Sequence, residues 1–356
     1  MSVFGYEREV AEKRVGHISQ LGGLKSYTLS DGRANGIRAV DFRTTRGLDF
    51  TVLLDRAMDI SEARYRGMSL CYRCPAGDVA PAHYDSRGIE WLWTFFGGLV
   101  TTCGLTQAGA PNTDQGEELG LHGRISTAPA EKISFSEEWC GDRLLLRVSG
   151  LVREARLFGP CLEMHRTITA YGDGAGLSVR DVITNAGARR TPLMLLYHIN
   201  LGFPLLDESS ELIMPTAAAQ PRDAEAEKGK ADFAKMHPPV TGYAEKVYFH
   251  TMKPCTEGQV NVALINRRLG HGGIALRLRY RASELPCFTE WKMLGDREYT
   301  LGLEPGTCLP MGRSAERAAG RVIEMEVGQQ VSAGFEIEVV EGAEAVEALA
   351  KEAAGT

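Results

Sequence analysis

The chain has 356 residues, of which 44% are hydrophobic and 24% are charged, with a formal net charge of −6. A globular chain of this length buries well over half of its unfolded surface, so folding needs neither disulfides nor a structural metal. Lys and Arg are scattered along the chain, which excludes the basic stripe of a nucleic-acid-binding surface. No apolar run approaches the ~20 residues of a membrane span, and the N-terminus lacks a signal core, so we expect a cytoplasmic protein.

Period-two alternation of apolar and polar residues dominates the chain and predicts β-strands. The segment Leu144–Leu157 indicates a long strand with a bend at Gly150. The next two predicted strands flank a glycine-rich segment, whose glycines supply the positive φ of a tight hairpin. In chain order, the predicted strands span residues 144–157, 162–171, 177–185, 274–281 and 335–339.

Helical patterns are few and short. Residues 223–235 predict a surface loop or a short helix, and residues 341–354 predict a C-terminal helical tail. Many strands joined by Gly and Asp turns, with almost no alternation of strand and helix, predict an all-β protein, specifically a large antiparallel β-sandwich. No linker, charge block or internal repeat divides the chain, so we expect residues 1–356 to form a single domain.

Eight cysteines are spread along the chain, and Cys71 and Cys74 form a Cys-x-x-Cys pair. This spacing suits two zinc ligands, but a tetrahedral site needs a second pair, which the sequence does not supply. Two reduced thiols beside a strand are the simpler interpretation, because cytosolic thiols are kept reduced.

Three segments of the chain place titratable residues among apolar or glycine neighbours. His198 and Asn200 are two residues apart in a predicted strand, so their side chains leave the same face. Glu304 lies between Leu303 and Pro305, and an isolated carboxylate with apolar neighbours has a raised pKa, which suits a general base near neutrality. Each also has a structural interpretation: a buried histidine hydrogen-bonded in the core, or a glutamate at a solvated loop end.

An earlier segment adds two candidate ligand contacts. Gly123 lets a ligand approach closely beside His122, and Arg124 offers a rigid fork of donors to hydroxyl groups.

The order of these motifs resembles the aldose 1-epimerase (galactose mutarotase-like) superfamily. The motifs are His122-Gly123-Arg124, then His198-Ile199-Asn200 in a strand, then Glu304-Pro305 near the C-terminus, and they cover nearly the whole chain. The resemblance implies a galactose mutarotase-like supersandwich and a cofactor-independent isomerase that interconverts sugar anomers. The short His-x-Asn spacing and the segment Leu54–Ile60 are not typical of the galactose mutarotases and indicate a divergent branch.

The resemblance also implies roles for individual residues. Glu304 is expected to take the proton of the anomeric hydroxyl and His198 to protonate the ring oxygen, while His122 and Arg124 bind neighbouring hydroxyls. Glu290 and Asp207 are the candidates for an acidic residue that holds the sugar. Further candidate sugar contacts are Asn200, Arg56, Asp59, Lys292 and Trp93, with Trp91 and Trp291 as possible stacking surfaces.

Two other functions fit the same residues. His122, His198 and Glu304 could ligate a divalent metal and support a metal-assisted sugar isomerase or lyase acting next to a carbonyl. A non-catalytic carbohydrate-binding protein would bind sugar without turnover. Under all three interpretations the expected partner is a small-molecule carbohydrate, and the three residues must converge in one sugar-sized hollow. The sequence carries no signal for the oligomeric state.

Overall fold

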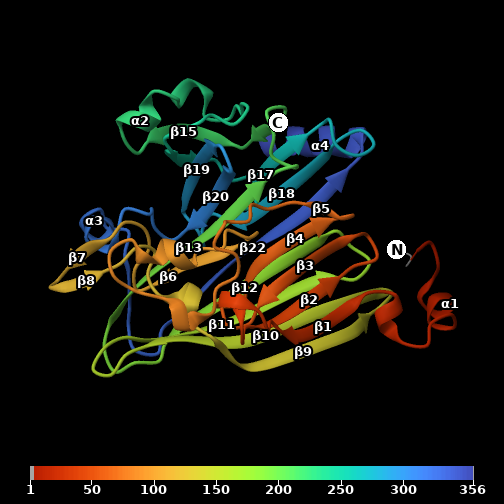
Figure 1. Ribbon diagram of the computed structural model, residues 1–356, viewed down its shortest axis with the longest axis horizontal. Coiled ribbons are helices and arrows are strands. Elements are labelled where there is room, and N and C mark those ends of the chain that lie inside the picture. Colours follow the sequence, from red (N-terminus) through yellow and green to blue (C-terminus); the bar gives the residue numbers. More distant parts are fainter. Residues whose placement is uncertain (1–3, 356) are drawn as a thin grey trace.

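The computed structural model describes residues 4–355, and nearly all of its strands lie in antiparallel sheets of eight, seven and five strands (Figure 1). A two-stranded hairpin completes the set. The predicted all-β class and antiparallel sandwich are therefore confirmed. Four of the five strands predicted from period-two alternation fall within observed strands, and the predicted strand 144–157 runs two residues past the end of β10 at Ala155.

The eight-stranded sheet contains the longest strands. The predicted bend at Gly150 is a β-bulge, because the pairing of β10 with β9 shifts register between Ser149 and Leu151. The strand order is β14-β17-β18-β22-β12-β11-β10-β9. Their bounds are β14 Glu211–Ile213, β17 Gln259–Asn266, β18 Ile274–Arg281, β22 Gln330–Glu341, β12 Gly176–Asn185, β11 Cys161–Tyr171, β10 Arg143–Ala155 and β9 Ala130–Cys140.

The seven-stranded sheet has the order β15-β16-β19-β20-β13-β21, and β6 also pairs with β13. Strand β13 is bordered by β20 on one side and by β6 and β21 on the other. The bounds are β15 Thr216–Pro221, β16 Lys246–Met252, β19 Cys287–Gly295, β20 Glu298–Gly306, β13 Thr191–Gly202, β21 Ile323–Met325 and β6 Thr101–Leu105.

The N-terminal part of the chain forms the five-stranded sheet, in which the strands follow in chain order. The hairpin β7–β8 comes between β6 and β9. The bounds are β1 Gly23–Thr28, β2 Arg38–Arg43, β3 Leu48–Leu53, β4 Asp59–Tyr65, β5 Met68–Ser69, β7 Asn112–Asp114 and β8 Glu117–Leu119.

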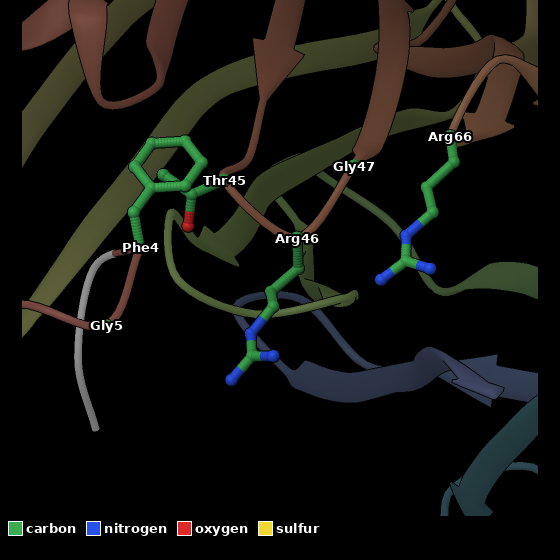
Figure 2. Close-up of a pocket in the computed structure, with 6 residues that line it drawn as sticks. All are labelled: Phe4, Gly5, Thr45, Arg46, Gly47 and Arg66. Atoms are coloured by element: carbon green, nitrogen blue, oxygen red, sulfur yellow. The ribbon is translucent and has the colours of Figure 1, made fainter. Parts of the chain in front are cut away.

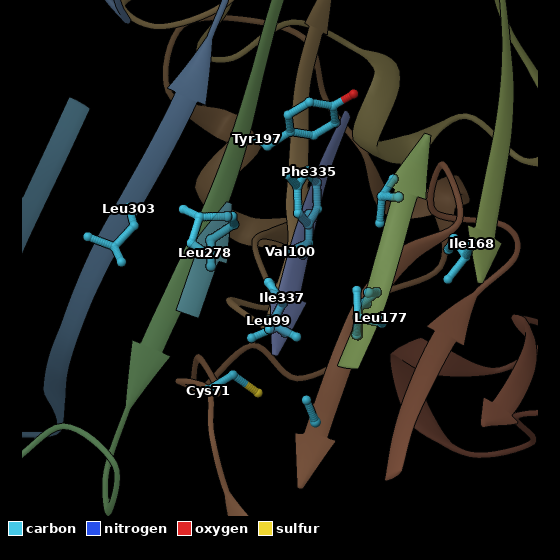
Figure 3. Close-up of a cluster of buried hydrophobic side chains, with 14 of the residues drawn as sticks. Cys71, Leu99, Val100, Ile168, Leu177, Tyr197, Leu278, Leu303, Phe335 and Ile337 are labelled. Atoms are coloured by element: carbon cyan, nitrogen blue, oxygen red, sulfur yellow. The ribbon is translucent and has the colours of Figure 1, made fainter. Parts of the chain in front are cut away.

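The main core is built from side chains of all three large sheets, and Figure 3 shows part of it between the eight- and seven-stranded sheets. Tyr197 of β13 packs edge-on against Phe335 of β22, with ring centroids 4.9 Å apart. On β13, the odd-numbered residues from Leu193 to Leu201 enter this core. Because side chains alternate along a strand, His198 leaves the opposite face of the sheet, away from the core.

Helices are few, as predicted. The segment 223–235 contains α2 (Ala224–Glu227), capped by the Asp223 carboxylate, and the C-terminal segment forms α4 (Ala343–Ala354). The apolar face of α4 packs on β17 and β18. Within residues 4–355, no helix has the length and apolar character needed to cross a membrane. The other α-helices are α1 (Arg8–Glu12) and α3 (Arg313–Ala318).

Candidate functional site

His198 and Glu304 form a close pair on the face of the seven-stranded sheet that points away from the core. The register that pairs Leu196 with Gly306 and Ile199 with Leu303 puts the two residues opposite each other on β13 and β20. His198 Nε2 lies 3.3 Å from Glu304 Oε1, and their side chains are only 7% and 2% exposed. The structure therefore brings together two residues that are 106 positions apart in sequence (304 − 198).

Burial shifts the two pKa values in opposite directions. Loss of solvent lowers the pKa of His198 to about 4, although the neighbouring Asn200 side chain and the charge of Glu245 act to raise it. Loss of solvent also raises the pKa of Glu304 well above its usual value, and Glu245 adds to this increase. Both shifts favour the uncharged form of each residue, so burial favours a shared proton on Glu304 rather than on His198.

Two atoms of this pair have no hydrogen-bond partner within the described part of the chain. They are His198 Nδ1 and Glu304 Oε1, and both are buried. Buried polar atoms are rarely left unpaired, and those that are often mark a place where a ligand or water binds.

His122 is the third member of the site. Its ring lies edge-on to that of His198, with centroids 5.7 Å apart. The backbone N–H of Gly109 donates to His122 Nδ1 at 3.3 Å, which leaves Nε2 to carry the ring proton. Burial, together with the proximity of His198, lowers the pKa of His122 to about 3. His122 is therefore a neutral hydrogen-bond donor. The backbone at His122 has φ of 56°, in the left-handed region.

Aromatic rings surround the two histidines. Trp91 stacks on Phe95 and contacts His122, with centroids 4.8 Å and 4.7 Å apart. Phe95 and Trp291 contact His198, with centroids 5.5 Å and 5.2 Å apart. The polar groups of the site are thus set in a mainly apolar wall.

An acidic residue that the sequence did not reveal lies beside this wall. Trp291 Nε1 donates to Glu245 Oε2 at 2.7 Å, and Arg222 binds Glu245 Oε1 at 2.8 Å. Glu245 is close enough to shift the pKa of both His198 and Glu304. It belongs to the irregular segment before β16, where no periodic pattern marks it out.

The comparisons with known proteins show the family and the fold of the chain. Residues 34–339 match the model of the family described as "Domain of unknown function (DUF4432)". The chain belongs to the DUF4432 family. A comparison with curated proteins finds no match.

Solved structures place this DUF4432 protein in the galactose mutarotase-like fold. A candidate aldose 1-epimerase from Klebsiella pneumoniae is 22% identical over 97% of this chain and 90% of its own, with a TM-score of 0.89. A galactose mutarotase-like protein from Clostridium acetobutylicum is 11% identical over 89% and 98% of the two chains, with a TM-score of 0.62. Galactose 1-epimerase from Lactobacillus acidophilus is 12% identical over 90% and 99%, with a TM-score of 0.51. At these identities the likeness shows the fold, and the predicted superfamily resemblance is confirmed at that level.

Three further predicted sugar contacts of the DUF4432 protein differ in exposure. Asn200 is fully buried, and its amide donates to the carbonyls of Gly97 and Gly98, so it fixes the adjacent loop. Arg124 is exposed next to His122. Trp93 is 67% exposed, two residues from Trp91.

The placement of Glu290 and Lys292 contradicts their predicted role as sugar contacts. They alternate with Thr289 and Trp291 on β19, so they point to the opposite face of the sheet from Glu304. Glu290 Oε2 lies 3.0 Å from His250 Nε2. The ammonium of Lys292 donates to the carbonyls of residues 232, 233 and 235, which attaches that segment to the sheet. Asp207, the other acidic candidate, binds Ser209 in the turn after β13.

Arg56 and Asp59 are structural rather than sugar-binding residues, which corrects a second prediction. The Arg56 guanidinium is fully buried and donates to the carbonyls of Val79, Thr94 and Ser126. Asp59 is also fully buried, and its carboxylate binds Thr102 and Arg166. All of these donors and acceptors are already used within the protein.

Cys71 and Cys74 do not form part of a metal site in the described part of the chain. Both thiols are free, and no group of three or more His, Cys, Asp or Glu side chains in residues 4–355 has an arrangement that could hold a metal ion.

Figure 2 shows a pocket beside the turn between β2 and β3. It is lined by Phe4, Gly5, Thr45, Arg46, Gly47 and Arg66, none of which belongs to the site around Glu304.

Proposed function

We propose that this protein is an aldose 1-epimerase, an isomerase that interconverts the α and β anomers of a reducing sugar by opening and closing the ring. The observation that carries the proposal is the 3.3 Å separation of His198 Nε2 and Glu304 Oε1 on neighbouring strands. Ring opening needs a base at the anomeric hydroxyl and an acid at the ring oxygen, and such positioned groups each contribute ~10²–10⁴-fold.

The proton inventory of the pair suits this reaction. The reacting form carries the shared proton on His198, so this proton first moves from Glu304 to His198 Nε2. Glu304 then takes the hydroxyl proton, the C1–O5 bond breaks, C1=O1 forms, and His198 protonates O5. The pair then holds its one proton on Glu304, which is the form that burial favours. Rotation about C1–C2 presents the other face of the aldehyde, and closure returns the proton to His198. The pair is therefore regenerated and no cofactor is consumed.

The surrounding residues are suited to holding a sugar. The neutral Nε2–H of His122 can donate to a hydroxyl or to the ring oxygen. The Glu245 carboxylate, oriented by Arg222 and Trp291, can accept from two adjacent hydroxyls. Aromatic faces such as those of Trp291 and Phe95 offer apolar surface to sugar C–H groups.

The decisive experiment measures anomer exchange directly. A panel of C1-labelled hexoses and pentoses is followed by NMR exchange spectroscopy with the wild type and with Glu304→Gln and His198→Asn. We expect catalysed exchange with the wild type, and a loss of at least ~10²-fold in each variant, with sugar binding retained in Glu304→Gln. Binding by the wild type without any exchange would instead identify a carbohydrate-binding protein.

Glu290→Gln is the matched control. Glu290 is also a buried glutamate beside a histidine, but it lies on the opposite face of the sheet. Its amide variant should keep the exchange activity, whereas equal losses in Glu290→Gln and Glu304→Gln would contradict the assignment. Exchange should also persist after treatment with a chelator, because no step passes through a metal.

A further inference from the structure

Thr289 stands next to Glu304 and has an unused hydroxyl group. The two residues are directly paired across β19 and β20, so their side chains share the face that carries the site. Thr289 is only 1% exposed, and its Oγ1 has no hydrogen-bond partner in the described part of the chain. A hydroxyl buried in this way has lost its hydration without a replacement.

The other buried threonines show that this is unusual for the protein. Within residues 4–355, each of the other nine buried threonines has its hydroxyl in a hydrogen bond with the backbone or with a carboxylate. Thr300, on the same strand as Glu304, donates to the carbonyl of Leu201 at 3.0 Å. The nine paired threonines are Thr44, Thr94, Thr101, Thr102, Thr106, Thr127, Thr191, Thr300 and Thr307.

Two unpaired polar atoms therefore lie on directly paired residues. Glu304 Oε1 lacks a partner as well. A single hydroxyl group placed between the two side chains would satisfy both, because it can donate its proton to the carboxylate and accept one from Thr289 Oγ1.

We propose that Thr289 donates a hydrogen bond to the anomeric oxygen of the bound sugar. This inference rests on the proposed function, in which Glu304 takes the proton from that same oxygen. As the proton leaves, negative charge develops on O1, so the hydrogen bond from Thr289 strengthens towards the transition state. Thr289 is thus a catalytic residue for ring opening.

Thr289→Val tests this role, because valine keeps the shape of threonine and removes only the hydroxyl. We expect kcat/KM to fall by ~10-fold, the effect of one hydrogen bond to a developing charge. We also expect Tm to stay the same or to rise, because an unpaired buried hydroxyl is removed. Thr289→Ser should restore most of the activity.

Thr300→Val is the matched control, since it removes a hydroxyl that is already paired on the same sheet. It should lower Tm and leave kcat/KM within about twofold of the wild type. The proposal is overturned if Thr289→Val keeps wild-type kcat/KM, or if it lowers Tm as much as Thr300→Val does. If the wild type exchanges no sugar of the panel, the proposed function itself is overturned. Equal activity of the wild type and Thr289→Val overturns only the role of Thr289.

Discussion

The carboxylate of Glu304 lies over Gly302, where a Cβ atom would stand only 2.7 Å from Glu304 Oε1. The same Cβ atom would also lie 3.0 Å from Trp291 Cβ. A side chain at position 302 must therefore displace the carboxylate. We expect Gly302→Ala to lower kcat by up to ~10²-fold, because a displacement of about 1 Å can have an effect of that size.

A double variant shows whether Gly302 acts through Glu304. If it does, Gly302→Ala should have little further effect in a Glu304→Gln background, whereas independent effects would multiply. Gly295→Ala is a suitable control, since its Cβ atom would meet only the mobile end of Met293 within 3.4 Å.

The raised pKa of Glu304 predicts how stability changes with pH. The folded protein keeps this proton above pH 4.5, where the unfolded chain releases it, so the stability is fully present below about pH 4.5 and is lost as the pH rises through the folded pKa. Each unit of difference corresponds to about 1.4 kcal/mol. The Tm of Glu304→Gln relative to the wild type should thus rise between pH 4 and pH 8 in calorimetry. A difference that does not vary with pH would contradict the pKa shift.

Removal of the Glu245 charge should move the whole pH profile of activity to lower pH. The negative charge of Glu245 raises the pKa of both His198 and Glu304, so Glu245→Gln lowers both values. The profile of kcat/KM is limited at low pH by addition of a second proton to the pair and at high pH by loss of its last proton. Both limits should shift in the same direction, and KM should increase. Shifts in opposite directions would show that Glu245 does not act through its charge.

The hydrogen bond from Gly109 to His122 predicts a single ring tautomer. Nitrogen NMR of labelled protein should show Nε2 protonated and Nδ1 unprotonated at all pH values above about 4, given a pKa of about 3. His122→Gln, whose amide can place an N–H near the Nε2 position, should retain more activity than His122→Asn. The reverse order, or a protonated Nδ1, would remove His122 as the donor.

Arg56 should prove essential for stability although it is remote from the chemistry. Loss of its guanidinium leaves the buried carbonyls of Val79, Thr94 and Ser126 unpaired, at a cost of about 1–3 kcal/mol each. Arg56→Met should therefore lower the free energy of unfolding by at least ~3 kcal/mol in urea titration. Arg124→Ala, at an exposed position, should change it by less than about 0.5 kcal/mol.

The fold was predictable because alternation along a strand is a local pattern. It revealed the strands around Gly150 and Gly174 and the shared face of His198 and Asn200, and the few helical patterns marked the helical segments. The resemblance to the mutarotases then brought His198 and Glu304 together, and the structure places them 3.3 Å apart.

The remaining sugar contacts were not predictable because they depend on which face a strand presents and on which partners are near. Glu290 and Glu304 look alike in sequence, yet Glu290 points into the molecule and Glu304 points into the site. The Arg56 side chain could bind a ligand, but its guanidinium donates to three carbonyls that are distant in sequence. Glu245 lies in an irregular segment, where no periodicity applies.

The contacts of Arg166 have a consequence for the integrity of the whole chain. This buried residue of β11 binds Asp59 of β4 at 2.9 Å and Asp181 of β12 at 2.7 Å, and Tyr197 of β13 donates to Asp181 at 2.7 Å. One continuous network of charges and hydroxyls thus joins members of all three large sheets. A fragment that began after β4 would lack Asp59, so the buried charge of Arg166 would lose one of its two counter-ions. We therefore expect that the strand that carries His198 does not fold stably without the N-terminal strands.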